Sequence, residues 1–216
     1  MLKPFPFLRQ TNCSDSCDTI LFQTSNFCVV PTRGALVEGW VLIVPKDPVI
    51  SFGFLPTDLW PEAIDLLERT RRAISTIYGG AVCFEHGPVV TGTTVGCGVD
   101  HAHLHVLPFF GNVFDNIPSE LNRTVSWRNA HSIKDTIGFR QDSTPYLYFE
   151  DDNGARICDS SNAPSQFFRR VIAAMIGKPN CFDWKDFPMT GNVDLTVEKL
   201  ATVFDSNLTK NVKQKV

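Results

Sequence analysis

Apolar and polar residues follow regular patterns along the first half of the 216-residue chain. Residues 20–23, 27–30, 40–44 and 81–85 are short apolar runs bounded by turn-forming residues, a pattern typical of β-strands. Between the third and fourth runs, residues 58–78 carry apolar side chains every three or four positions, which predicts one long amphipathic helix. This order predicts an α+β fold in which an antiparallel sheet carries the helix on one face.

The second half of the chain has a looser pattern. Residues 111–144 show no clear period and predict an irregular connection with short helical turns. A β-hairpin and two helices are predicted after it, at residues 146–150, 155–158, 165–176 and 195–204. The polar tail from residue 206 is expected to fray. We therefore expect a core domain over residues 1–110 and an α/β C-terminal extension over 111–216 that packs on the core.

The overall charge limits the partners that the chain can bind. A formal charge of −3 and a pI of about 5.9 argue against a broad basic surface for polymeric nucleic acid. No apolar run approaches the ~20 residues that a membrane span requires, and the first residues lack the apolar core of a signal peptide. We therefore expect a cytoplasmic protein that binds neither a membrane nor a nucleic-acid polymer.

One short run concentrates the chemistry, because three of the five histidines lie within five residues. His101, His103 and His105 alternate with apolar residues, and residues 99–107 predict a strand. Successive side chains of a strand point to opposite faces, so all three imidazoles are expected on one face. Their rings would span roughly 13 Å, a length that suits a chain of phosphates or a metal site.

This histidine run resembles the signature of the histidine triad (HIT) family of nucleotide hydrolases and transferases. The resemblance extends to the strand over residues 39–46, which ends in Pro-Lys, and to the Glu85-His86-Gly87 stretch, and it covers roughly residues 20–110. It implies a HIT-like antiparallel sheet with the long helix packed on it. The core domain would then be the nucleotide-binding and catalytic unit, with a homodimer as one option.

The resemblance also implies an activity. The chain would be a nucleotide hydrolase or nucleotidyl transferase that cleaves at the α-phosphate of a dinucleoside polyphosphate, a phosphoramidate or a nucleotide sugar. His103 would attack phosphorus and form a covalent nucleotidyl-histidine intermediate, since neutral imidazole is a competent nucleophile near pH 7. His101 and His105 would bind the phosphoryl oxygens and the leaving group. The implied partner is a small-molecule nucleotide, no metal or cofactor is required, and the base, the leaving group and the acceptor stay open.

A glycine- and threonine-rich loop before the triad supplies candidates for phosphate binding. Glycines let backbone N–H groups approach an anion closely, and threonine hydroxyls add donors. Where many family members have Gly-Gln-Ser-Val, this chain has Gly-Cys-Gly-Val, so a serine hydroxyl is absent and the leaving-group preference is in doubt. The region of Glu85 and His86 often holds an orienting asparagine in the family. The candidate nucleotide- or phosphate-binding residues are Thr94, Gly96, Cys97, Gly98, Val99, Glu85 and His86, with Gln166, Arg169 and Arg170 as further candidates from the extension.

Two other interpretations stay open. The first is a zinc-dependent hydrolase in which two of the three imidazoles bind the metal. The second is a non-catalytic nucleotide-binding protein, which the missing serine and the extension favour. The pair Cys13 and Cys17, with the spacing Cys-x3-Cys, also has two interpretations: a structural zinc site, as in some HIT proteins, or two free thiols. The chain has seven cysteines, and this odd number does not predict a disulfide framework.

Overall fold

The structure, a computed structural model, describes residues 16–93, 99–109 and 111–213, with side chains up to residue 204. Its strands are β1 (Phe22–Gln23), β2 (Phe27–Pro31), β3 (Val41–Pro45), β4 (Val82–Gly87), β5 (Leu104–Leu107), β6 (Arg128–Ala130), β7 (Tyr146–Asp151) and β8 (Gly154–Asp159). Its α-helices are α1 (Trp60–Tyr78), α2 (Ser119–Asn122), α3 (Thr136–Gln141), α4 (Phe167–Met175) and α5 (Thr190–Lys213). Short 3-10 helices lie at Ser16–Asp18, Phe52–Phe54, Thr57–Leu59, Phe114–Asn116, Ile133–Asp135 and Pro179–Cys181.

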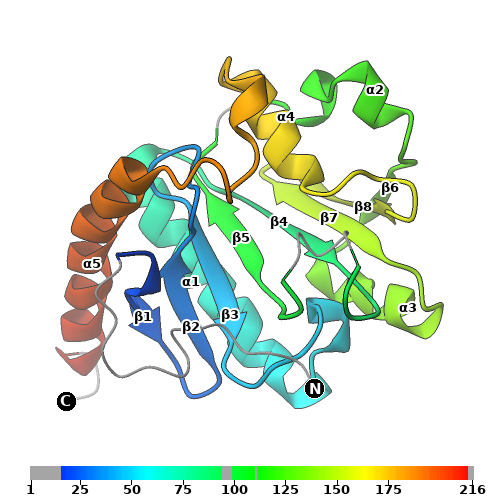
Figure 1. Cartoon of the computed structure of the whole chain (residues 1–216). Coiled ribbons are helices and arrows are strands. Elements are labelled where there is room, and N and C mark those ends of the chain that lie inside the picture. Colours follow the sequence, from blue (N-terminus) through cyan, green and yellow to red (C-terminus); the bar gives the residue numbers. More distant parts are fainter. Residues whose placement is uncertain (1–15, 94–98, 110, 214–216) are drawn as a thin grey trace.

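The strands form one antiparallel sheet in the order β1-β2-β3-β5-β4-β7-β8-β6 (Figure 1). Strand β5, which ends the histidine run, lies between β3 and β4 in the middle of the sheet. Strand β7 pairs with β4, with Tyr148 opposite Glu85, so the sheet continues across residue 110. The C-terminal half therefore extends the sheet of the first half, and the division into 1–110 and 111–216 stays a prediction.

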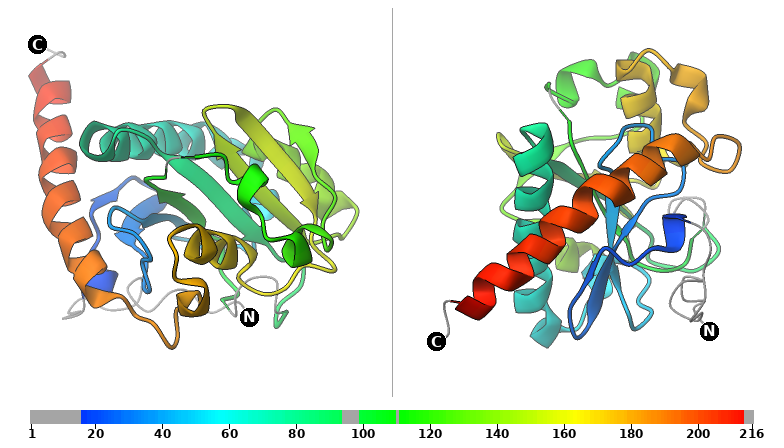
Figure 2. Two further views of the ribbon diagram at one scale, coloured as in Figure 1. Left: turned by 90° about the horizontal axis from the view of Figure 1, so that it is seen from above. Right: turned by 90° about the vertical axis from the view of Figure 1, so that its left-hand side faces the viewer.

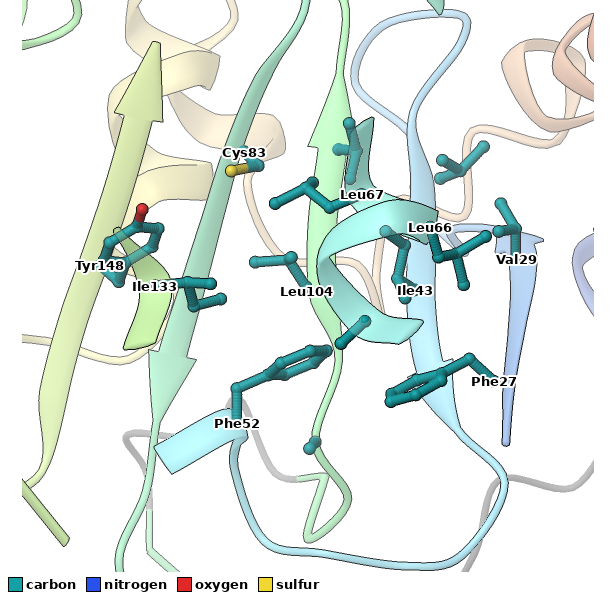
Figure 3. Close-up of a cluster of buried hydrophobic side chains, with 14 of the residues drawn as sticks. Phe27, Val29, Ile43, Phe52, Leu66, Leu67, Cys83, Leu104, Ile133 and Tyr148 are labelled. Atoms are coloured by element: carbon teal, nitrogen blue, oxygen red, sulfur yellow. The ribbon is translucent and has the colours of Figure 1, made fainter. Parts of the chain in front are cut away.

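Helix α1 packs across one face of this sheet. Its buried stripe includes Leu66 and Leu67, which share a cluster with Ile43 of β3 and Leu104 of β5 (Figure 3). Gly79 ends the helix with a φ of 88°, a left-handed conformation that glycine adopts without the steric cost of a Cβ atom. The predicted antiparallel sheet with one long helix on its face is therefore confirmed.

Truncation in this cluster should destabilise the fold. Leu66→Ala is expected to lower the free energy of unfolding by about 2–5 kcal/mol, because the side chain is 0% exposed and its loss leaves a cavity. The control is Leu195→Ala, whose leucine is 41% exposed and should change the free energy by less than about 1 kcal/mol. Chemical denaturation measures both values. Equal effects of the two substitutions would contradict the packing of α1 on the sheet.

Helix α4 covers the opposite face of the sheet (Figure 2, left). The ring of Phe168, in its first turn, lies 4.8 Å from Phe84 of β4 and 5.5 Å from Phe149 of β7, measured between centroids. Trp40, just before β3, packs edge-on against Phe84, with ring centroids 5.7 Å apart. Helix α4 of the predicted extension therefore packs aromatic side chains on the central strands of the sheet.

Several boundaries differ from the prediction. Strand β5 begins at Leu104 and not at residue 99, because the preceding backbone forms hydrogen bonds outside the sheet: the Ala102 N–H donates to the Val49 carbonyl oxygen at 2.7 Å.

Two elements of the C-terminal half also differ from the prediction. Strand β6 lies inside the stretch predicted to be irregular. Helix α5 extends into the predicted tail as far as Lys213, and the Phe204 ring of this helix stacks on Phe22 at 5.4 Å. Neither α5 nor another helix in the described residues is both long and apolar enough to cross a membrane.

Candidate active site

The histidine run lies where β5 meets the face that α4 covers. Ala102 and Leu104 belong to the core under α1, so alternation along β5 directs His105 to the opposite face. The rings of His103 and His105 are 5.0 Å apart between centroids. His101 donates from Nε2 to the Pro45 carbonyl oxygen at 2.8 Å. All three side chains are buried, with exposed fractions of 0%, 7% and 4% in chain order.

His103 is held in one tautomer by the backbone. Its Nδ1 lies 2.7 Å from the carbonyl oxygen of His101, and because a carbonyl can only accept, Nδ1 carries the proton and Nε2 carries the lone pair. Burial lowers the pKa of His103 to about 4, against the opposing effect of this hydrogen bond. The ring is therefore neutral at pH 7, with its nucleophilic nitrogen fixed as Nε2.

His105 has the opposite tautomer. The indole N–H of Trp40 donates to Nδ1 of His105 at 3.0 Å, and because an indole N–H can only donate, the proton of His105 is on Nε2. This Nε2 is buried and has no hydrogen-bond partner among the described residues. The ring also stacks on Phe84 at 4.4 Å. Burial, with smaller effects of neighbouring His103, His86 and Arg169, keeps the pKa of His105 well below its ordinary range.

His86 is a fourth histidine of this cluster. It lies on β4, next to β5, and its ring centroid is 6.2 Å from that of His105. The backbone N–H of Phe168, in the first turn of α4, donates to its Nε2 at 3.3 Å, which places the proton on Nδ1. Nδ1 has no partner among the residues that the structure describes, and burial lowers the pKa of His86 to about 3.

Glu85 lies apart from the histidines, because it precedes His86 in the strand and points to the other face. Its carboxylate accepts the backbone N–H of Phe52 at 2.7 Å and the hydroxyl of Tyr146 at 2.5 Å. Burial raises the pKa of Glu85 from 4.5 to about 7, although both hydrogen bonds oppose the shift. The structure therefore brings His86 to the triad and places Glu85 under the segment that follows β3.

The raised pKa of Glu85 gives a pH-dependent contribution to stability. The folded protein binds this proton more tightly than the unfolded chain, so the contribution is full below pH 4.5 and is lost as pH rises through about 7. Glu85→Gln removes the titration. Relative to wild type, the variant should gain up to about 3 kcal/mol of unfolding free energy between pH 5 and pH 8. The exposed Glu120→Gln is the control, and a difference that does not change with pH would refute the effect.

Trp40 and Arg169 also belong to this cluster, although neither is part of the triad motif. Arg169 of α4 is 2% exposed, and it donates to the carbonyl oxygens of Phe182 and Gly34, both at 2.7 Å. Its guanidinium also lies over the Trp40 ring at 5.1 Å. The sequence indicates Arg169 as a further candidate for nucleotide binding from the extension, whereas it gives no signal for Trp40 beyond its place in a predicted strand. The structure brings both to His105 through long-range packing.

Several predicted residues cannot be placed. Thr94, Gly96, Cys97 and Gly98 of the loop, and Cys13 of the cysteine pair, lie outside the described residues. Val99 is half-buried at the start of the next described segment. Cys17, the other member of the pair, is buried and its Sγ lies 3.1 Å from a guanidinium nitrogen of Arg33. Their roles in phosphate or zinc binding stay predictions.

The zinc interpretation can be compared with the side chains that are described. Among them, no three or more histidine, cysteine, aspartate or glutamate side chains are arranged to share one metal ion. Two imidazole nitrogens of the triad, Nε2 of His101 and Nδ1 of His103, donate to carbonyl oxygens. The described geometry thus adds no support for a metal held by the triad.

Sequence comparison does not identify this chain: no protein-family model and no curated protein matches it. Comparison of structures finds partial similarities to histidine triad proteins. Yeast Ap4A phosphorylase in complex with Ap4A aligns over 87% of this chain and 80% of its own, with 11% identity and a TM-score of 0.46.

Two further proteins also align with this structure at low sequence identity. A HIT-like protein from Bartonella henselae, described as involved in cell-cycle regulation, aligns over 43% of this chain and 67% of its own, with 15% identity and a TM-score of 0.37. A zinc-bound histidine triad family protein from Mycobacterium smegmatis aligns over 57% and 81%, with 17% identity and a TM-score of 0.35.

Proposed function

We propose that this chain is a nucleotide hydrolase or nucleotidyl transferase in which His103 attacks the α-phosphorus of a nucleoside phosphate derivative. The observation that carries the proposal is the 2.7 Å hydrogen bond between His103 Nδ1 and the His101 carbonyl oxygen. This bond leaves the lone pair on Nε2 in a ring that burial keeps neutral, which is the form of imidazole that acts as a nucleophile.

The reaction has two displacements. In the first, the Nε2 lone pair of His103 forms a bond to phosphorus, and the bond from phosphorus to the leaving group breaks, with its electron pair departing on the leaving group. The ring becomes cationic while Nδ1–H keeps its bond to the carbonyl of His101, which favours the charged ring. In the second, water attacks phosphorus and the bond from phosphorus to Nε2 breaks, with its electron pair returning to Nε2 and restoring the neutral ring. The attacking water loses a proton to solvent and the nucleoside monophosphate is released; a transferase uses another acceptor in place of water.

The charge on the phosphoryl oxygens in these displacements needs donors that are already oriented. His105 supplies an N–H group at Nε2, because Trp40 holds its other nitrogen. Arg169 adds a fixed positive charge close enough to lower the pKa values of His86 and His105. Both features support binding of an anionic phosphate beside His103.

Turnover tests this proposal directly. The full chain is incubated with a dinucleoside polyphosphate, a nucleoside phosphoramidate and a nucleotide sugar, and the products are separated by chromatography. Release of a nucleoside monophosphate, or its transfer to an added acceptor, from at least one of them is expected. Tight binding without turnover of any substrate would instead support a nucleotide-binding protein without catalytic activity.

A further inference from the structure

We propose that Trp40 and the first turn of α4 hold His105 and His86 as neutral N–H donors of fixed tautomer, which together bind anionic oxygen of the substrate without donating a proton to its leaving group. Trp40 acts here as a positioning residue, since it touches His105 and not the reacting atoms. The identity of the bound anion as a substrate oxygen rests on the proposed function, whereas the tautomers of the two rings follow from hydrogen bonds within the protein.

The tautomers follow from which nitrogen of each ring already has a donor. His105 Nδ1 receives the indole N–H of Trp40 at 3.0 Å, and His86 Nε2 receives the backbone N–H of Phe168 at 3.3 Å. Neither donor group can accept, so each ring presents a lone pair to it and carries its proton on the other nitrogen. The contacts come from distant parts of the chain, 65 and 82 residues away, and converge on neighbouring strands.

The remaining N–H groups are the unusual feature. His105 Nε2 and His86 Nδ1 are both buried without a hydrogen-bond partner among the described residues. A buried donor left unpaired costs about 1–3 kcal/mol, and the two rings lie 6.2 Å apart between centroids. An acceptor oxygen bound beside them would remove this cost, which points to a ligand and not to a purely structural role.

The surrounding charge selects an anion as that ligand. The charged or titratable groups that act on both His86 and His105 are His103 of the same run and Arg169 of α4, and His86 also acts on His105; all of them are basic. The Arg169 guanidinium lies over the Trp40 ring at 5.1 Å, so the residue that sets the tautomer of His105 also packs against a fixed cation. A phosphate oxygen meets two N–H donors and a positive field there.

The same hydrogen bonds limit proton transfer. A ring that receives an N–H donor at its second nitrogen cannot take up a proton there while that bond lasts. His105 and His86 can therefore bind an oxygen but cannot act as imidazolium acids. A leaving group that receives no proton from these two rings departs most readily as a stable anion, which favours phosphate anhydrides over phosphoramidates.

Nuclear magnetic resonance of the imidazole nitrogens tests the tautomers without any activity measurement. In the full chain labelled with ¹⁵N-histidine, His105 should show a protonated Nε2 and His86 a protonated Nδ1, both unchanged from pH 7 to pH 5. Trp40→Phe removes the indole N–H and should give His105 mixed tautomers and a higher pKa, with His86 unaffected. The control is Trp60→Phe, since Trp60 is equally buried on the other face and its Nε1 has no partner among the described residues.

Separate outcomes distinguish this inference from the proposed function. A wild-type His105 that is protonated on Nδ1, or that averages between tautomers at pH 7, overturns the inference even if Trp40→Phe does not fold. Added AMP should shift the Nε2–H signal of His105 and the Nδ1–H signal of His86, and no shift of either would overturn the anion site. Fixed tautomers and AMP shifts without turnover would refute the proposed function and leave this inference standing.

Kinetics tests the leaving-group preference. The wild-type protein should cleave a dinucleoside polyphosphate with a kcat/KM at least about 10²-fold above that for a nucleoside phosphoramidate, the size of a typical general-acid contribution. Trp40→Phe should narrow this ratio as the pH is lowered, because no N–H donor then occupies His105 Nδ1 and this nitrogen can accept a proton. Equal or faster cleavage of the phosphoramidate by the wild-type protein would overturn the preference.

Discussion

His103→Ala is expected to lower turnover by at least about 10⁴-fold, because it removes the atom that forms the bond to phosphorus. The fold should tolerate the change, since His103 lies at the edge of the buried cluster and the strand that follows it is held on both sides by β3 and β4. Nucleotide binding should weaken far less than turnover. The measurement is kcat, with a separate binding titration of AMP.

His131→Ala is the matched control for this substitution. His131 is an exposed histidine of the loose segment between β6 and α3, and its replacement should leave kcat unchanged. Comparable activity of His103→Ala and wild type, with both folded, would show that phosphorus is attacked by another group or by water directly. The proposed covalent step would then be wrong.

Acidification is expected to remove several kcal/mol of unfolding free energy between pH 7 and pH 4. Burial lowers the pKa of His103 to about 4 and of His86 to about 3, and it also lowers the pKa values of His101 and His105. The unfolded chain takes up protons at these positions near pH 6.5, whereas the folded protein does not. The contribution of the neutral histidines to the free energy of unfolding is therefore full above pH 6.5. It is lost as the pH falls through their pKa values in the folded protein, by at most about 1.4 kcal/mol per pH unit for each histidine.

Chemical denaturation at a series of pH values measures this loss. His86→Gln should make the curve shallower below pH 6.5 because it removes one of the titrating groups, and the substitution of an exposed histidine, His131→Gln, is the control. Glu85 acts in the opposite direction, since its raised pKa favours the folded state as the pH falls. A free energy of unfolding that does not change between pH 7 and pH 4 in wild type and Glu85→Gln would contradict neutral burial of the histidines.

The elements that depend on local pattern were predictable from the sequence. The period of residues 58–78 predicts α1, and Asn153-Gly154 predicts the hairpin of β7 and β8. The alternation after residue 101 predicts that Leu104 and His105 point to opposite faces. They do, because Leu104 lies in the cluster under α1 and His105 stacks on Phe84 of the cluster under α4. Local pattern does not reveal that the backbone N–H of Ala102 donates to the Val49 carbonyl oxygen and not to a neighbouring strand. The start of β5 was therefore predicted five residues early.

The chemical environment of the histidines depends on long-range contacts that a single sequence does not encode. Trp40 is 65 residues from His105, and Phe168 is 82 residues from His86. Strand parity could have separated Glu85 from His86, because neighbouring residues of a strand face opposite sides. That inference required β4 to extend to Gly87, whereas the apolar pattern ended at residue 85.

Intact-protein mass spectrometry without an acid quench tests the covalent step most directly. The full chain is mixed with a dinucleoside polyphosphate and, in parallel, with a nucleoside phosphoramidate, and the mass is recorded before turnover is complete. The account predicts an added mass of one nucleotidyl group on the wild-type chain, mapped to His103 by peptide analysis and absent from His103→Ala. Rapid turnover with no adduct at any time, or an adduct on another residue, would contradict it.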